Sequence, residues 1–183
     1  MKSGPFRLDQ LSPWSAEELL HIVVETPRGS GAKLKYDAEL GAMTLSRPLP
    51  LGVVYPFDFG FVPQTCAEDG DPLDAAVVLD VATFPGVVLR CRPIGVVKAT
   101  QKGAGGTRIR NDRLITVSAD DRRHAHLREA RDVPAREREE IEQFFAAAVA
   151  LEGKELEVLG WGDAAEARAT VERAVARCRR GAG

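Results

Sequence analysis

The feature that most limits the fold of this chain is a series of short apolar runs between residues 20 and 118, each interrupted by glycine or proline. The runs are rich in β-branched residues, which favour pleated strands, and they are too short for ordinary helices. Many short strands at close spacing are typical of an antiparallel sheet closed into a barrel. The strand candidates are residues 20–26, 34–38, 42–47, 75–81, 87–92, 94–100 and 114–118, with a hairpin turn at Gly41.

The C-terminal part of the chain has a different composition, rich in alanine, glutamate and arginine. A helix is predicted from about Pro134 to Leu151, because apolar residues recur there with the i, i+3, i+4, i+7 spacing of a buried face. Asp132 is expected to cap this helix. A strand over 154–160 and a second helix over 164–178 follow.

These patterns together predict an α+β, mainly β, protein. An antiparallel sheet closed into a barrel is expected at its centre and helices in its C-terminal part, within one domain that spans residues 1–183. The glycine-rich segment 102–112 is expected to form a hairpin loop, because glycine weakens regular structure.

Charge and cysteine content exclude several classes of partner. The chain has 25 Lys and Arg against 27 Asp and Glu, so its net charge of −2 offers no general attraction for nucleic acid or anionic membranes. No apolar run reaches the roughly 18–20 residues that span a bilayer. Three cysteines, Cys66, Cys91 and Cys178, are widely spaced without a CxxC pair. A reduced, cytoplasmic protein is therefore expected, with Cys66 as a packing residue.

The segment from Glu68 to Asp74 is the most informative for chemistry. Its acidic residues Asp69, Asp71 and Asp74 crowd into a polar loop just before an apolar strand. Carboxylates this close repel one another unless a cation lies between them, and a hard divalent ion such as Mg²⁺ suits carboxylate oxygens. The alternative is a solvated acidic turn, since Asp, Gly and Pro are all turn residues. The spacing alone leaves both interpretations open.

A second group of residues favours the metal interpretation. Glu25, Lys35, Arg47 and Tyr55 each lie beside an apolar strand residue, and Lys35 and Arg47 fall on neighbouring strands of a predicted hairpin. Metal-binding carboxylates opposite lysine, arginine and tyrosine donors are what phosphoryl transfer requires, because cations clamp phosphate oxygens and metals activate water. Taken singly, Lys35 and Arg47 read as ordinary surface charges.

With these residues, the sequence resembles the soluble family I inorganic pyrophosphatases. DGDPLDAAV matches their signature Asp-x-Asp-Pro-aliphatic-Asp-aliphatic, and other segments follow in order over about residues 15–175. These segments are IVVETP (22–27), KY (35–36), YPFDFGFVPQT (55–65), GVVLRCRPIGVVK (86–98), VP…IEQFF (133–145) and LEGKELEVLGW (151–161). The resemblance implies a five-stranded, antiparallel OB-like barrel with flanking C-terminal helices and a domain core of about 15–175. It also implies Mg²⁺-dependent hydrolysis of pyrophosphate to two phosphates, with Mn²⁺ as an alternative ion, and a homohexamer.

The resemblance also implies roles for individual residues. Asp71 would be the general base for the attacking water, and Lys35, Arg47 and Tyr55 would grip phosphate oxygens. Arg113 falls where the family has a substrate-binding lysine. The metal ligands implied are Asp69, Asp71, Asp74, Glu25, Asp37 and Asp112.

Several positions depart from the family pattern. Phe59 replaces a tyrosine, Gln101 replaces a metal-binding aspartate, and Ala148 and Val149 replace a Tyr-Lys pair. A second metal-binding aspartate aligns with Asn111 or Asp112, depending on where the glycine-rich insertion is placed. An amide oxygen is a poor substitute for a carboxylate on Mg²⁺, and Ala148 and Val149 donate no hydrogen bond.

Two hypotheses follow from these departures. The first is an active but divergent pyrophosphatase in which cations of the 102–113 segment replace the lost donors. The second is a catalytically weak homologue that binds phosphate compounds or serves as an interaction or regulatory protein. The candidates for the compensating cations are Lys102, Arg108, Arg110 and Arg113.

Overall fold

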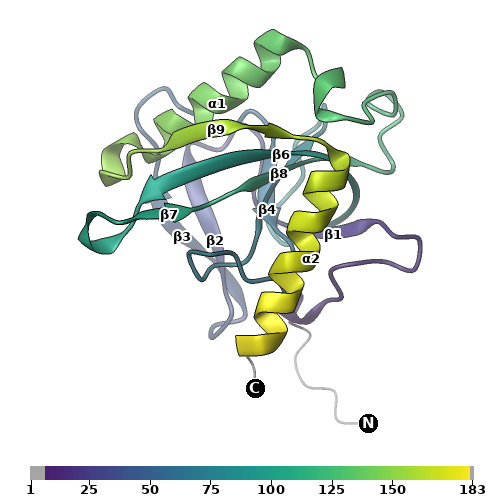
Figure 1. The fold of residues 1–183 in the computed structure, drawn as a ribbon, viewed down its shortest axis with the longest axis horizontal. Coiled ribbons are helices and arrows are strands. Elements are labelled where there is room, and N and C mark those ends of the chain that lie inside the picture. The colour runs from purple at the N-terminus through teal and green to yellow at the C-terminus, as the bar shows by residue number, and fades with distance from the viewer. Residues whose placement is uncertain (1–6, 182–183) are drawn as a thin grey trace.

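A closed ring of five strands forms the centre of the computed structural model, which describes residues 7–181 (Figure 1). Around the ring each strand pairs with the next, and β6 pairs with β1 to close it, so the predicted five-stranded barrel is confirmed. In ring order the strands are β1 (Leu20–Thr26), β4 (Asp58–Phe61), β5 (Asp74–Val78), β8 (Arg113–Ser118) and β6 (Val88–Lys102).

One pairing in the ring departs from the antiparallel pattern. β5 and β8 run parallel, with Asp74 opposite Arg113 in the register, while the other ring pairs are antiparallel. Both strands therefore begin at the same rim of the barrel. The acidic segment before β5 and the segment before β8 meet there, although about 40 residues separate them in the sequence.

The remaining strands extend this ring. β2 (Ala32–Asp37) and β3 (Ala42–Pro48) form the predicted hairpin, with Gly41 at a positive φ of 63° in its turn. β7 (Arg108–Arg110) and β9 (Glu157–Gly162) both pair with β6. The two strands predicted over 87–100 are one long strand, β6, which shifts register between Pro93 and Gly95. β4 was not predicted.

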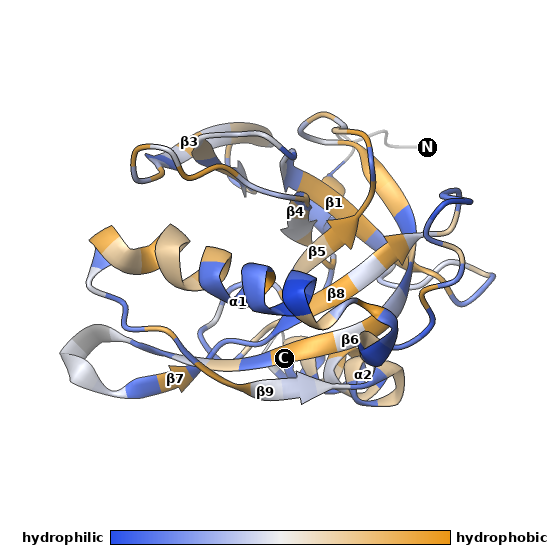
Figure 2. Ribbon diagram, turned by 90° about the horizontal axis from the view of Figure 1, so that it is seen from above, coloured by the Kyte–Doolittle hydropathy of each residue, from blue (hydrophilic) through white to orange (hydrophobic). Residues whose placement is uncertain are grey.

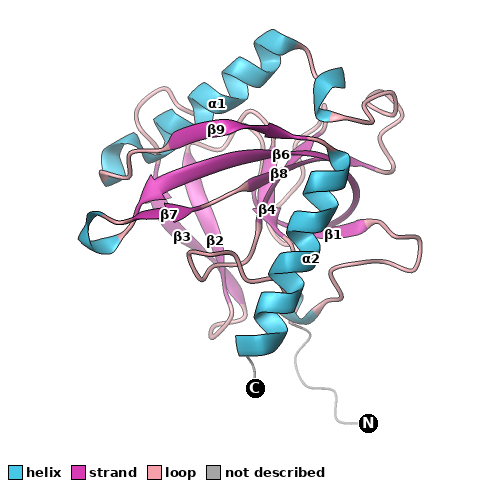
Figure 3. Ribbon diagram, in the orientation of Figure 1, coloured by secondary structure: helices cyan, strands magenta, loops and turns pink. Residues whose placement is uncertain are grey.

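Two helices lie outside the barrel (Figure 3). α1 (Ala135–Val149) and α2 (Ala164–Gly181) agree with the predicted helices. The described residues also contain four short 3-10 segments. The predicted cap is wrong: Pro134 precedes α1 without a side-chain cap, and the Asp132 carboxylate accepts from the N–H groups of Arg128 and Glu129. The 3-10 segments are η1 (Leu8–Gln10), η2 (Ala104–Gly106), η3 (Ala130–Asp132) and η4 (Ala150–Glu152).

Each helix covers its own part of the apolar core. Figure 2 shows largely hydrophobic strands β5 and β8, while α1 has hydrophilic and hydrophobic turns. Ile141, Phe144 and Phe145 of α1 pack against one side of the barrel, where aromatic rings of the β4 region meet them. Ala167 and Val171 of α2 pack on a second apolar cluster. None of the helices among residues 7–181 is long and apolar enough to cross a membrane.

Candidate active site

The acidic loop between β4 and β5 is a tight turn at the rim of the barrel. The N–H of Ala67 donates to the carbonyl oxygen of Asp71 over 2.7 Å, and Gly70 adopts a φ of 91° that other residues rarely take. The N–H of Asp71 donates to Oδ1 of Asp69 over 3.2 Å. This turn gathers Asp69 and Asp71 next to Asp74, the first residue of β5.

Negative charge is crowded at this rim. Burial raises the pKa of Asp69, and the neighbouring carboxylates of Asp74 and Asp71 raise it further. Burial, and then the charge of Asp74, raises the pKa of Glu25 to about 7, even though Oε1 of Glu25 accepts a hydrogen bond of 2.7 Å from the N–H of Tyr36. Buried carboxylates whose pKa is raised by neighbouring carboxylates are stabilised by a nearby cation.

A lysine supplies part of that positive charge. Nζ of Lys35 lies 2.8 Å from Oδ1 of Asp71. Partial burial opposes the charge on Lys35, but Asp71, followed by Glu25 and Asp74, raises its pKa overall. These four residues line a cavity of about 220 Å³ beside β2.

A second, smaller cavity of about 30 Å³ holds the predicted phosphate-binding groups. Arg47, Tyr55 and Arg113 line it together with Asp74. Tyr55 is buried, and burial followed by the charge of Asp74 raises its pKa, so its hydroxyl remains protonated and can donate. Nη1 of Arg113 donates to the carbonyl oxygen of Asn111 over 2.7 Å, and its guanidinium lies 5.0 Å from the centre of the Phe145 ring.

Arg47, which lines this cavity, has an unused donor. One of its terminal nitrogens pairs with Glu152. The other, Nη1, is buried without a hydrogen-bond partner among the described residues. Because a buried unpaired donor costs free energy, this nitrogen is a natural position for an anionic ligand oxygen.

Lys33 is a site residue that the sequence interpretation missed. It lies opposite Arg47 in the β2–β3 register and lines both cavities, whereas Lys35 lines only the larger one. No ion pair of Lys33 occurs among residues 7–181. The sequence does place Lys33 on the same face of the strand as Lys35, because residues two apart on a strand share a face. It does not show which of the two lysines is nearer to Arg47.

The two candidates for the second loop carboxylate separate in the structure. Asn111 faces the acidic turn, and its Nδ2 donates to Oδ2 of Asp69 over 2.8 Å. Asp112 makes no hydrogen bond to that turn among the described residues: its Oδ1 accepts from the N–H of Ala99 at 3.1 Å and from Nε of Arg110 at 2.5 Å.

Asp37 also lies apart from the acidic turn. Its Oδ1 accepts from the N–H groups of Glu39 and Leu40, both over 2.9 Å, so it closes the β2–β3 hairpin. Neither Asp37 nor Asp112 lines the two site cavities.

Three of the departures from the family pattern also fall at the site. Phe59, Ala148 and Val149 line the smaller cavity and offer no polar atom to a ligand. Gln101 is buried on β6. Of the cations proposed as replacements, Arg113 alone borders this cavity. The other three pair elsewhere: Lys102 with Glu155, Arg108 with Glu157 at 3.2 Å, and Arg110 with Asp112 at 2.5 Å.

The donor set fits a hard divalent cation, although no three acidic, histidine or cysteine side chains within residues 7–181 converge closely enough to hold one as they lie. The rim groups are oxygen ligands, and burial together with mutual repulsion raises the pKa values of Asp69 and Glu25. Mg²⁺ needs few protein ligands because it keeps several waters. The ion pair between Lys35 and Asp71 must open for an ion to use both oxygens of Asp71.

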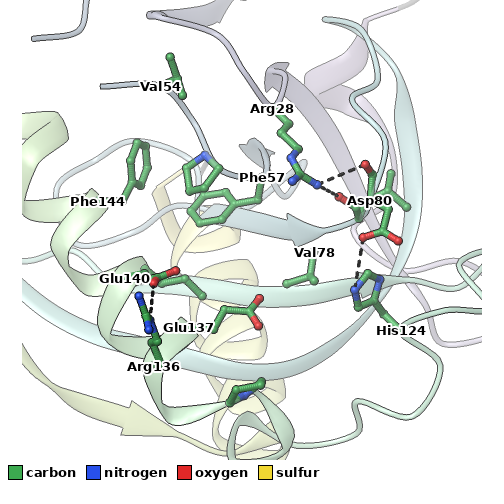
Figure 4. Close-up of a pocket in the computed structure, with 14 residues that line it drawn as sticks. Arg28, Val54, Phe57, Val78, Asp80, His124, Arg136, Glu137, Glu140 and Phe144 are labelled. Atoms are coloured by element: carbon green, nitrogen blue, oxygen red, sulfur yellow. Dashed lines mark hydrogen bonds and ion pairs between the residues drawn. The ribbon is translucent and has the colours of Figure 1, made fainter. Parts of the chain in front are cut away.

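A larger cavity of about 830 Å³ lies apart from these residues, between α1 and the end of β5 (Figure 4). Most of its charged groups pair within the chain: Arg28 donates to the carbonyl oxygens of Leu79 and Asp80, His124 lies 3.7 Å from Asp80, and Arg136 pairs with Glu140 at 3.1 Å. The floor is apolar, with Phe57 and Val78. Within residues 7–181 the charged groups that line this cavity mostly pair with one another, so it is a weaker candidate for an anion site.

Comparison with known proteins gives the family of this chain. The model of the family described as inorganic pyrophosphatase matches residues 22–179. The chain belongs to the inorganic pyrophosphatase family. It is 42% identical over 165 residues to the inorganic pyrophosphatase of Thermus thermophilus, covering 88% of this chain and 91% of that protein. The inorganic pyrophosphatase of Streptomyces coelicolor is 42% identical over 157 residues, covering 85% and 93%.

Solved pyrophosphatase structures share the fold. The crystal structure from Thermus thermophilus superimposes with a TM-score of 0.87 at 39% identity, covering 95% of this chain and 99% of that one. The pyrophosphatase structure from Helicobacter pylori gives a TM-score of 0.85 at 29% identity, covering 93% and 99%. The OB-like pyrophosphatase fold expected from the sequence is therefore confirmed.

Proposed function

We propose that this chain hydrolyses inorganic pyrophosphate to two phosphates. The observation that carries the proposal is the unpartnered Nη1 of Arg47 in a cavity shared with Lys33, Tyr55 and Arg113, next to the acidic rim. Three cations and a phenol there suit a small, highly charged anion. Membership of the pyrophosphatase family points to the same substrate.

The chain's own side chains hold the substrate and accept the proton. Lys33, Arg47 and Arg113 offset the charge of the phosphate oxygens, and Tyr55 donates its hydroxyl hydrogen. Asp71 lies at the most exposed part of the acidic turn, where its carboxylate accepts a proton from the attacking water. Lys35, 2.8 Å from Asp71, orients that carboxylate and adds charge for the substrate.

We assign the metal positions to the acidic rim. Asp69, Asp71 and Asp74 would hold Mg²⁺, or Mn²⁺ in its place, and Glu25 would contribute from β1. When bound, these ions neutralise phosphate charge and make water a better nucleophile. Asp37 and Asp112 are not part of this proposal, because each accepts hydrogen bonds from groups outside the acidic turn.

The apolar lining of the smaller cavity favours a second candidate, a catalytically weak homologue that binds phosphate compounds. Ala148 and Val149 stand where donors to the leaving phosphate are expected. Losing one donor to a developing oxyanion costs about 3–4 kcal/mol, or roughly 10²–10³ in rate, and such losses are not additive. Arg113, Lys33 and the free nitrogen of Arg47 offset part of this loss, so we favour an active hydrolase.

Phosphate release from pyrophosphate with Mg²⁺ or Mn²⁺ tests the proposal. The Asp71→Asn variant should lose about 10²–10⁴ in kcat, the range of general base catalysis. Asp120→Asn serves as a matched control, because Asp120 is exposed and pairs only with Arg90 at 3.4 Å. Background release by the native chain with both metals would refute the hydrolase, and full activity of Asp71→Asn would refute the assigned base.

We also propose a cytoplasmic homo-oligomer, a hexamer by resemblance. Free thiols at all three cysteines and large exposed apolar side chains, such as those of Leu45, Leu51 and Phe84, support this. Light scattering during gel filtration should give six times the chain mass of 19.8 kDa. A mass equal to one chain would contradict the assembly.

A further inference from the structure

The acidic loop is attached to the C-terminal helix at its beginning, just before the carboxylates. The N–H of Cys66 donates to the carbonyl oxygen of Ala174 in α2 over 3.1 Å. Nη1 of Arg177 donates to the carbonyl oxygen of Cys66 over 2.8 Å, and its Nη2 lies 3.5 Å from Glu68. Three contacts thus hold this part of the loop against the last turns of α2.

These contacts bring two cysteines together. Cys178 follows Ala174 by four residues, so the two share one face of α2. That face carries the carbonyl oxygen that binds Cys66. The thiol of Cys178 lies near enough to that of Cys66 to raise the pKa of Cys66. Both cysteines are partly exposed, whereas Cys91 is fully buried in β6. Within residues 7–181 only Cys66 and Cys178 therefore combine a neighbouring thiol with access to solvent.

We propose that Cys66 and Cys178 form a reversible disulfide under oxidising conditions, which fixes the acidic loop to α2. The oxidant is a peroxide. One thiolate attacks a peroxide oxygen, which breaks the O–O bond, gives a sulfenic acid and releases hydroxide. The second thiol then attacks that sulfur, the S–S bond forms, and the sulfenic oxygen leaves as water. In total two thiols and one hydrogen peroxide give one disulfide and two waters.

The surroundings of the thiols set the rate of this reaction. Burial, and then the contact with Cys178, raises the pKa of Cys66 to about 11. The thiolate is the reactive form, so it is scarce at neutral pH and its fraction rises about tenfold for each pH unit below that pKa. The disulfide should therefore form slowly at pH 7 and faster at pH 8.5. This distinguishes it from a fast peroxide sensor.

A disulfide here would alter the acidic loop. An S–S bond is about 2.05 Å long, much shorter than any contact between two thiols, so its formation pulls Cys66 toward α2. Cys66 lies three residues before Asp69 and five before Asp71. A misplacement of about 1 Å at a reacting group can cost on the order of 10² in rate. Oxidation should therefore lower hydrolysis, an effect that rests on the proposed function, whereas the crosslink itself does not.

The experiment treats the full-length protein with hydrogen peroxide at pH 7 and pH 8.5, followed by digestion without reduction and mass spectrometry. We expect a linked peptide pair containing Cys66 and Cys178, lighter by two hydrogen atoms than the sum of the two peptides and lost after dithiothreitol. Cys91→Ser should still form the link, and Cys178→Ser should not. Absence of the linked pair at both pH values, or a pair containing Cys91 instead, would overturn the proposal.

Activity gives the second measurement. Oxidised native protein should lose most of its pyrophosphate hydrolysis and regain it with dithiothreitol, while Cys178→Ser should keep its activity through the same treatment. An oxidised, fully crosslinked protein with unchanged activity would overturn the coupling to the loop. A reduced protein without any hydrolysis would refute the proposed function instead. The mass spectrum of the linked peptides would still test the crosslink.

Discussion

Replacing Glu25 by glutamine should make the protein more stable at alkaline pH when metals are absent. Glu25 is buried in β1 at 6% exposure, and burial followed by the charge of Asp74 raises its pKa from 4.5 to about 7. The folded chain therefore holds the proton of Glu25 more tightly than the unfolded chain. A glutamine keeps the shape and the acceptor oxygen for the N–H of Tyr36 but carries no charge.

The size of the effect follows from that pKa difference. At about 1.4 kcal/mol per pKa unit, ionising Glu25 in the folded state costs roughly 3 kcal/mol. Below pH 4.5 the carboxyl is protonated in both states and this cost is absent. The cost grows as the pH rises from 4.5 to about 7, because the unfolded state loses its proton first, and it is complete above that range.

Urea unfolding in a chelator, measured at several values from pH 4.5 to pH 8.5, checks this prediction. The free energy of unfolding of Glu25→Gln minus that of the native chain should rise by about 3 kcal/mol across the range. The exposed Glu139 provides a control, since Glu139→Gln should show a flat difference. A flat difference for Glu25→Gln would refute the argument that Glu25 is a strained buried carboxylate.

Added Mg²⁺ extends the test to the metal. At pH 8 a cation at the acidic rim offsets the charge of Glu25, so Mg²⁺ should stabilise the native chain more than Glu25→Gln, as ligands of the native state do. Equal stabilisation of the two proteins would remove Glu25 from the set of residues that respond to the metal.

Three further predictions concern the site. Lys33→Ala should lower kcat/KM by about 10² through loss of a phosphate cation, while Lys102→Ala should not; equal losses in steady-state assays would contradict the assignment of Lys33. Tyr55→Phe should lower kcat by about 10-fold or more with little change in melting temperature, and an unchanged kcat would exclude its hydroxyl from catalysis. Asn111→Asp should lower the melting temperature without metal, because it replaces a donor to Asp69 by a like charge, and should raise the Mg²⁺ affinity in calorimetry; a weaker affinity would exclude position 111 from the metal shell.

Most of the barrel could be predicted from the sequence because its strands are apolar runs bounded by glycine and proline. β4 was not predicted because Asp58–Phe61 is short and holds a glycine. In addition, its buried aspartate finds hydrogen-bond partners only in the tertiary structure, the N–H of Arg28 at 2.8 Å and the hydroxyl of Thr83 at 2.6 Å. The parallel pairing of β5 with β8 was also hidden, because strand direction depends on the path of β6 between them.

The site was harder to resolve than the fold, because it depends on which way neighbouring side chains point. Lys33 and Lys35 lie on one face of β2, and only the cross-strand partner distinguishes the lysine nearer to Arg47. Asn111 and Asp112 are adjacent, but only Asn111 donates to the acidic turn, whereas Asp112 accepts from the N–H of Ala99. The start of β8 decides which, and no sequence pattern marks that start.

The parallel pairing of β5 and β8 has a consequence for how freely the chain can vary. The first residue pair of that pairing, Asp74 opposite Arg113, fixes the position of Arg113 and of the nearby Asn111. The turn that joins β6 to β7 takes no part in this pairing. Insertions or deletions around residues 103–107 should therefore leave the rim unchanged. We expect related chains to differ in the length of this turn without loss of the site.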